Sequence, residues 1–114
     1  MSSTEDAVPT EPMQLSDPAD LDDAVAQYDV VLVDFYADWC GPCQMMEPTI
    51  KSLASQTKAA VMKVDVDRFQ GLAGQYSVQG IPTLLVFVDG EPVERLVGAQ
   101  SEQQLSDVIQ QYTA

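Results

Sequence analysis

Both cysteines of the chain lie in one short motif, the sequence WCGPC at residues 39–43. A thiol pair at this spacing can close into a small disulfide ring and reopen with little movement of the backbone. The motif directly follows an apolar run over residues 30–37, so the thiols are predicted where a buried strand gives way to a helix. The free N–H groups and the dipole of a helix N-terminus stabilise a thiolate. The pattern therefore predicts dithiol–disulfide exchange.

Two other interpretations of the cysteine pair have less support. A purely structural disulfide would close too short a loop to restrict the unfolded chain much, because the entropic gain grows with loop length. A zinc site needs about four cysteine or histidine ligands, whereas the chain has two cysteines and no histidine. No metal ligand is assigned, since a metal would need carboxylates or a second subunit.

Further motifs accompany the pair in a fixed order. Residues 33–38 read VDFYAD, a lysine stands at position 63, and residues 80–83 read GIPT. From about residue 15 to the C-terminus, this arrangement closely resembles the thioredoxin family. The resemblance implies an α/β thioredoxin fold, with a central mixed sheet of four to five strands flanked by four helices.

The order of the two cysteines predicts their roles. Cys40 is expected to be the nucleophile because it lies nearest the helix N-terminus and only the thiolate attacks a disulfide. Cys43, one turn into the helix, is expected to be more buried and to act as the resolving thiol. Gly41 allows a large substrate to approach, and Pro42 stiffens the ring. In the family, Gly-Pro between the cysteines goes with reductants, so the resemblance favours a reductase over an oxidase or isomerase.

A carboxylate and a lysine are the remaining catalytic candidates. Asp34 stands inside the apolar run, where burial raises the pKa of a carboxyl and makes it a plausible proton acceptor for Cys43. The alternative is a structural hydrogen-bonding group, or exposure through strand curvature. Lys63 matches the family position that approaches this aspartate and could tune it. A surface lysine with a buried stem is nearly as consistent with the sequence.

A docking surface for substrates is also implied by the resemblance. Pro82 matches the family's cis-proline, which would turn the backbone of Ile81 toward a bound peptide for strand-like hydrogen bonds. Trp39 would belong to this surface, although half-buried packing is an alternative. The predicted substrate-binding residues are Trp39, Gly41, Pro42, Ile81, Pro82, Val97, Gly98 and Ala99.

The sequence departs from the family pattern beside the cysteines. Gln44 stands where many relatives have lysine, and Tyr36 where many have a second tryptophan. Without that nearby positive charge, and with Asp38 close by, the Cys40 thiolate is expected to be less favourable electrostatically. The departure concerns the redox poise, not the type of reaction.

The chain is strongly acidic, with 18 acidic and 5 basic residues, a net charge of −13 and no lysine or arginine among residues 1–50. This charge argues against nucleic-acid binding, which needs a basic surface to meet phosphates. One interpretation is an ordinary acidic protein with an acidic tail. The scarcity of lysine favours another, adaptation to high intracellular salt in a halophilic archaeon, where screening weakens self-repulsion.

The remaining sequence predicts one domain. Residues 1–13 read as a disordered acidic tail and residues 14–114 as the thioredoxin-like domain. Asp89-Gly90 signals a hairpin, Ser101 a helix cap, and Pro48 a kink in a helix over residues 40–57 with Met45 and Met46 among its core candidates. Predicted helices cover residues 18–28, 40–57, 68–76 and the segment from 101 onward. Predicted strands cover residues 30–37, 60–66, 83–88 and 92–97, with 13–15 as a weak fifth.

The predicted partners are proteins. The N-terminus lacks the basic and apolar parts of a secretory signal, and no apolar stretch is long enough to span a membrane, so a cytoplasmic monomer is expected. No nucleotide fingerprint occurs, so no cofactor is predicted and a separate thioredoxin reductase must supply electrons. Disulfide-containing clients complete the expected partners. The alternatives are a thiol–disulfide oxidase or isomerase, and a non-catalytic binding module that uses the fold's apolar face.

Overall fold

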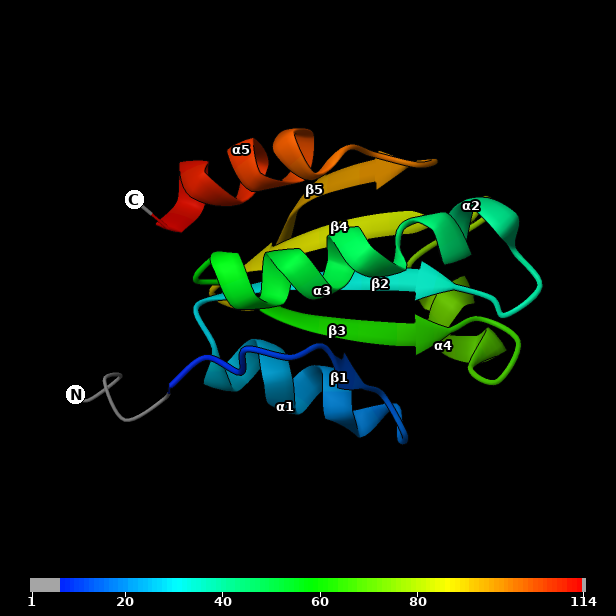
Figure 1. Cartoon of the computed structure of the whole chain (residues 1–114). Helices are drawn as coiled ribbons and strands as arrows, with labels where there is room; N and C mark the ends of the chain where they lie inside the picture. Colours follow the sequence, from blue (N-terminus) through cyan, green and yellow to red (C-terminus); the bar gives the residue numbers. More distant parts are fainter. Residues whose placement is uncertain (1–6, 114) are drawn as a thin grey trace.

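The computed structural model describes residues 7–113, which form a five-stranded sheet with helices on both faces (Figure 1). The strands are β1 (Met13–Gln14), β2 (Val30–Tyr36), β3 (Ala60–Asp65), β4 (Thr83–Val88) and β5 (Glu91–Val97). The helices are α1 (Ala19–Gln27), α2 (Gly41–Met45), α3 (Glu47–Gln56), α4 (Gln70–Gln75) and α5 (Glu102–Thr113).

The sheet is mixed, with strand order β1-β3-β2-β4-β5. β1, β3 and β2 are parallel, whereas β4 and β5 run antiparallel to their neighbours. Every residue of the central strand β2 is buried, which explains its nearly continuous apolar sequence. Alternate side chains of β2 enter two separate cores. One core packs against α1 and α4, and the other against α3 and α5.

The helix predicted over residues 40–57 is two helices that meet at Met46. Pro48 lies in the first turn of α3, where a residue without an N–H group is tolerated. Inside a continuous helix its ring would clash with the carbonyl of Gln44, so the chain begins a new helix instead. This break accounts for five helices in the described part of the chain, where the sequence predicted four.

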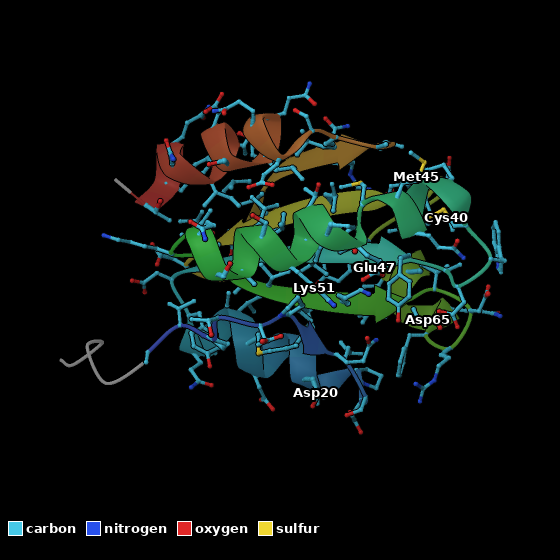
Figure 2. The ribbon with its side chains drawn as sticks, in the orientation of Figure 1. Asp20, Cys40, Met45, Glu47, Lys51 and Asp65 are labelled. Atoms are coloured by element: carbon cyan, nitrogen blue, oxygen red, sulfur yellow. A yellow bond between two sulfur atoms is a disulfide. The ribbon has the colours of Figure 1, made fainter. Side chains whose placement is uncertain are left out.

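Met45 corrects one core prediction. Its side chain is 81% exposed, whereas the neighbouring Met46 is buried with Ile50 and Leu53. The short helix α2 turns Cys43 and Met46 inward, and Met45 therefore lies on its outer side (Figure 2). An apolar residue type alone could not distinguish the two adjacent methionines.

The predicted hairpin and cap are both confirmed. Asp89 and Gly90 have positive φ values of 51° and 86°, the conformation that a two-residue turn between twisted strands requires. At the start of α5, the Ser101 hydroxyl accepts the N–H of Gln104, and the Gln104 side chain accepts the N–H of Ser101. This reciprocal pair satisfies two free donors at the helix N-terminus.

The ordered structure includes part of the segment that was predicted as a tail. Met13 and Gln14 form β1, so the last residue assigned to the tail belongs to the sheet, and Val8 packs against the core on the α1 side. Residues 1–6 of the predicted tail lie outside the described residues. Among residues 7–113, no helix is long and apolar enough to cross a membrane.

Candidate active site

Cys40 and Cys43 form a disulfide at the end of the sheet where β2 leads into α2. Their Cα atoms are 5.2 Å apart. Cys40 is the N-cap of α2, with an extended backbone conformation, and Pro42 lies in the first turn. The backbone N–H of Cys43 donates to the Sγ atom of Cys40 over 3.2 Å. The Cys40 sulfur therefore already receives a hydrogen bond that would stabilise a thiolate at the same position.

Burial does not distinguish the two cysteines, contrary to the prediction that Cys43 is the more buried. Each is 4% exposed, because the disulfide holds both sulfurs in one small cluster with Tyr36 and Ala37. Their hydrogen-bond environment does distinguish them. The Cys40 sulfur occupies the cap position and lies 3.9 Å from the carbonyl oxygen of Ile81.

Asp34 is buried within β2, as its apolar surroundings predicted, and is 3% exposed. Its Oδ1 atom has no hydrogen-bond partner among the described residues. Burial raises its pKa from 3.8 to about 7, while the charge of Lys63 lowers the value and that of Glu47 raises it. A carboxyl in this environment can bind and release a proton near neutral pH.

Lys63 lies beside Asp34 but is paired with another carboxylate. The two residues are register partners on the parallel strands β2 and β3, so their side chains leave the same face of the sheet. The Lys63 ammonium forms an ion pair of 2.5 Å with the Glu47 carboxylate and lies 4.4 Å from the ring centre of Tyr36. Figure 2 shows Glu47 at the same end of the molecule as Cys40. No sequence motif marks Glu47 as a site residue.

Most of the predicted docking residues are at least partly exposed. Trp39 is 70% exposed, so it is not half-buried packing, and its indole N–H donates to Asp67 over 2.8 Å. Val97 is 59% exposed and lies 3.5 Å from the Cβ position of Gly80. Gly41, Pro42 and Ala99 are also exposed, whereas Ile81 is partly covered.

A backbone hydrogen bond at Pro82 joins two of the segments predicted to bind substrate, residues 81–82 and 97–99. The Ile81–Pro82 peptide is cis, as the resemblance implied, and Pro82 is buried. The Pro82 carbonyl accepts the N–H of Gly98 over 2.8 Å, and Gly98 has a φ of +92° that a larger residue would adopt only with strain. This bond sets Val97 and Gly98 beside the start of β4.

Two positions that depart from the family pattern take part in local hydrogen bonds. The Gln44 side-chain amide donates to the carbonyl of Asp38, which ties α2 to the loop before it. The Tyr36 hydroxyl accepts a 3.0 Å hydrogen bond from Gln14, and burial raises the pKa of the Tyr36 phenol. Neither side chain brings a positive charge to the cysteines.

Besides Glu47, two residues in this region were not predicted from the sequence as site residues. Asp67 lies outside any motif, and its contact with Trp39 spans 28 positions. Exposed Met45 adds apolar surface on the outer side of α2. Within residues 7–113, no group of three or more histidine, cysteine or acidic residues could hold a metal ion.

The comparisons with known proteins agree on one protein family. The thioredoxin family model matches residues 12–111. Thioredoxins from Staphylococcus aureus strains are 45% identical over 96 residues, which cover 82% of this chain and 91% of the relative.

Solved structures agree with the sequence comparisons. A mutant thioredoxin from Halobacterium salinarum NRC-1 is 56% identical, with a TM-score of 0.92 and coverage of 95% of this chain and 96% of the other. A thioredoxin from Schistosoma mansoni is 34% identical, with a TM-score of 0.82 and coverage of 90% and 96%. The likeness therefore extends from the fold to most of the sequence.

Proposed function

The chain belongs to the thioredoxin family, and on that premise we propose that Cys40, Cys43 and Asp34 divide the work of disulfide reduction between them. The chain is a thiol–disulfide oxidoreductase that reduces disulfides in substrate proteins, and a thioredoxin reductase is the partner that restores its thiols. Cys40 is the nucleophile, Cys43 the resolving thiol and Asp34 the proton acceptor. The single observation that carries the assignment of Cys40 as nucleophile is the hydrogen bond from the Cys43 N–H to the Cys40 sulfur.

The reaction begins with the reduced pair. The Cys40 thiolate attacks one sulfur of a client disulfide, and the client S–S bond breaks as a mixed disulfide forms. The Cys43 thiol then gives its proton to Asp34 and attacks the Cys40 sulfur. The mixed disulfide breaks and the second client sulfur leaves as a thiolate. The client has gained two electrons and binds two protons, and the Cys40–Cys43 disulfide holds the oxidising equivalents until the reductase removes them.

Client binding is assigned to the region around the disulfide. The proposed substrate-binding residues are Trp39, Gly41, Pro42, Ile81, Pro82, Val97, Gly98 and Ala99. Support comes from the exposure of Trp39 and Val97 and from the short distance between the Cys40 sulfur and the Ile81 carbonyl. An extended client segment there would bring its sulfur to Cys40 and could donate a backbone N–H to the Ile81 carbonyl.

Lys63 is proposed to act on Asp34 through its charge. Its position beside Asp34 on the adjacent strand supports this role, because a nearby cation stabilises the ionised carboxyl. The catalytic domain is assigned to residues 14–114, supported by the family match over residues 12–111. We further propose a cytoplasmic monomer, with the clients and the reductase as its partners.

The assignment of Cys40 as nucleophile predicts which thiol reacts first. In the reduced protein, limiting iodoacetamide at neutral pH is expected to label Cys40 at least about tenfold faster than Cys43, since only the thiolate reacts readily. Peptide mass spectrometry at early times gives the two rates directly. Unfolded protein in denaturant serves as the control, in which the two rates are expected to converge. Faster labelling of Cys43 in the folded protein would reverse the assignment.

The acidic composition predicts a response to salt. Adaptation to high salt is supported by the 56% identity to a thioredoxin of a halophilic archaeon and by the charge of −13. At about 1 M salt the screening length is only about 3 Å, so repulsion between surface carboxylates largely disappears. Both the melting temperature and the rate of Cys40 alkylation are expected to rise between about 0.05 M and 2 M KCl, a span that crosses this screening range.

A control separates the screening of surface charge from the general stabilisation that any added solute can give. The uncharged solute sucrose, at matched osmolality, is the control for non-specific stabilisation. Flat or falling melting temperatures and alkylation rates over the KCl series would contradict the high-salt interpretation. The acidity would then be an ordinary solubility feature of the surface.

A further inference from the structure

Glu47 is a charged residue at the active-site end of the molecule to which the reaction described above assigns no role. It opens α3, and its carboxylate pairs with the Lys63 ammonium across 16 positions of sequence. The Lys63 side chain is only 14% exposed and that of Glu47 38%, so water screens this pair less than it would a pair on the open surface.

The pairing leaves Asp34 without a cation bonded to it. Asp34 and Lys63 are register partners on β2 and β3, so a change of the Lys63 side-chain rotamer could bring its ammonium to the Asp34 carboxyl. In the structure the ammonium is bound to Glu47 and lies over the ring of Tyr36 instead, and Asp34 Oδ1 has no hydrogen-bond partner among the described residues.

We propose that Glu47 is a positioning residue for disulfide reduction: its carboxylate holds the Lys63 ammonium over Tyr36 and keeps this cation from pairing with Asp34. The inference rests on the proposed function, in which Asp34 accepts the proton of Cys43. A direct ion pair with Lys63 would stabilise the aspartate as a permanent carboxylate and weaken it as a base. With the lysine held by Glu47, the buried carboxyl keeps the proton affinity that the transfer requires.

The groups around Asp34 allow a clean test. Lys63 on β3 and Glu47 on α3 are the charged side chains that act on its pKa, and β4 places the apolar Leu84 opposite it. Cys43, on α2, titrates only after reduction. The oxidised protein therefore isolates the Asp34 titration from the thiols.

The experiment is an NMR titration of the Asp34 side-chain carboxyl in the oxidised protein. In Glu47→Gln the freed Lys63 can pair with Asp34, so its pKa is expected to fall by about half a pH unit or more, a factor of about three in the ratio of ionised to protonated carboxyl. Glu47→Asp keeps the negative charge and is expected to restore most of the difference. Glu91→Gln removes the same charge at the hairpin, at the other end of the sheet, and is expected to change nothing.

The same titration in a Lys63→Met protein separates the positioning of the Lys63 ammonium from the direct effect of the Glu47 charge on Asp34. In Lys63→Met the Glu47→Gln change is expected to shift the Asp34 titration by less than half as much, because no ammonium remains to be released. Equal shifts with and without Lys63 would mean that Glu47 acts only by its own charge and would overturn the proposal, as would the absence of any shift. Because this titration involves no client reduction, it remains decisive even if Asp34 proves not to be the proton acceptor.

Discussion

Replacement of Cys43 by serine is expected to stop the reaction at the mixed disulfide and to leave the client joined to Cys40. A serine hydroxyl cannot displace the client sulfur, so the intermediate that Cys43 normally resolves accumulates. Sustained reduction of insulin disulfides is expected to fall by about two orders of magnitude or more, since paired catalytic groups that act as a unit are lost together. Non-reducing gels and intact-mass spectrometry would detect the adduct, and added dithiothreitol should release it.

Cys40→Ser is the matched control for this experiment. It removes the nucleophile and is expected to abolish turnover as well, but without forming an adduct. The double replacement is expected to resemble Cys40→Ser. If Cys40→Ser trapped clients and Cys43→Ser did not, the roles of the two thiols would be reversed, and equal trapping by both variants would contradict the assignment of Cys40 as the only nucleophile. Trapping by both variants would also show that burial of Cys43 does not protect it from clients, which the equal exposure of the two residues leaves open.

Replacement of Asp34 by alanine is expected to stabilise the fold at alkaline pH and to slow catalysis. The folded-state pKa of Asp34 is raised from 3.8 to about 7, so the native state binds more protons than the unfolded state between these values. The contribution of Asp34 to the free energy of unfolding therefore falls as pH rises through this window, by about 4 kcal/mol in total at about 1.4 kcal/mol per pH unit. In Asp34→Ala this pH-dependent loss of stability is absent.

Chemical denaturation at two pH values tests the sign. At about pH 8 the variant is expected to be more stable by on the order of 3 kcal/mol. This figure is the cost of burying the ionised carboxylate, which alanine removes, minus a small loss of packing. At about pH 4 the difference is expected to be near zero or slightly unfavourable, because the carboxyl is then protonated in the native state. Asp23→Ala removes an exposed carboxylate and is the control, with little change expected at either pH.

The same variant tests the role of Asp34 in proton transfer. Client reduction is expected to slow by about tenfold or more at neutral pH, because Cys43 has lost its base. The rate of the unmodified protein is expected to rise with pH through the Asp34 pKa of about 7, and this rise should be missing in the variant. Stabilisation without any change in the pH profile would leave Asp34 as a buried charge with no catalytic part.

The sequence by itself determined the features that depend on neighbours along the chain. A nearly continuous apolar run of this length, rich in valine, favours a strand buried on both faces, and this predicted β2 and the burial of Asp34 within it. The Asp89-Gly90 turn and the Ser101 cap were predictable because their hydrogen bonds and φ values involve residues a few positions apart.

Only the tertiary structure decided which distant side chains meet. The family resemblance could place Lys63 near Asp34. The pairing of Lys63 with Glu47 depends on the position of the first turn of α3, which follows the break at Met46. The contact of Trp39 with Asp67 depends in the same way on a loop far along the chain. The chain has 18 acidic residues, and composition cannot select which of them reaches a given cation or indole. Charge attraction is non-specific at a distance, so the partner is fixed by the position and direction of each side chain once the helices have packed.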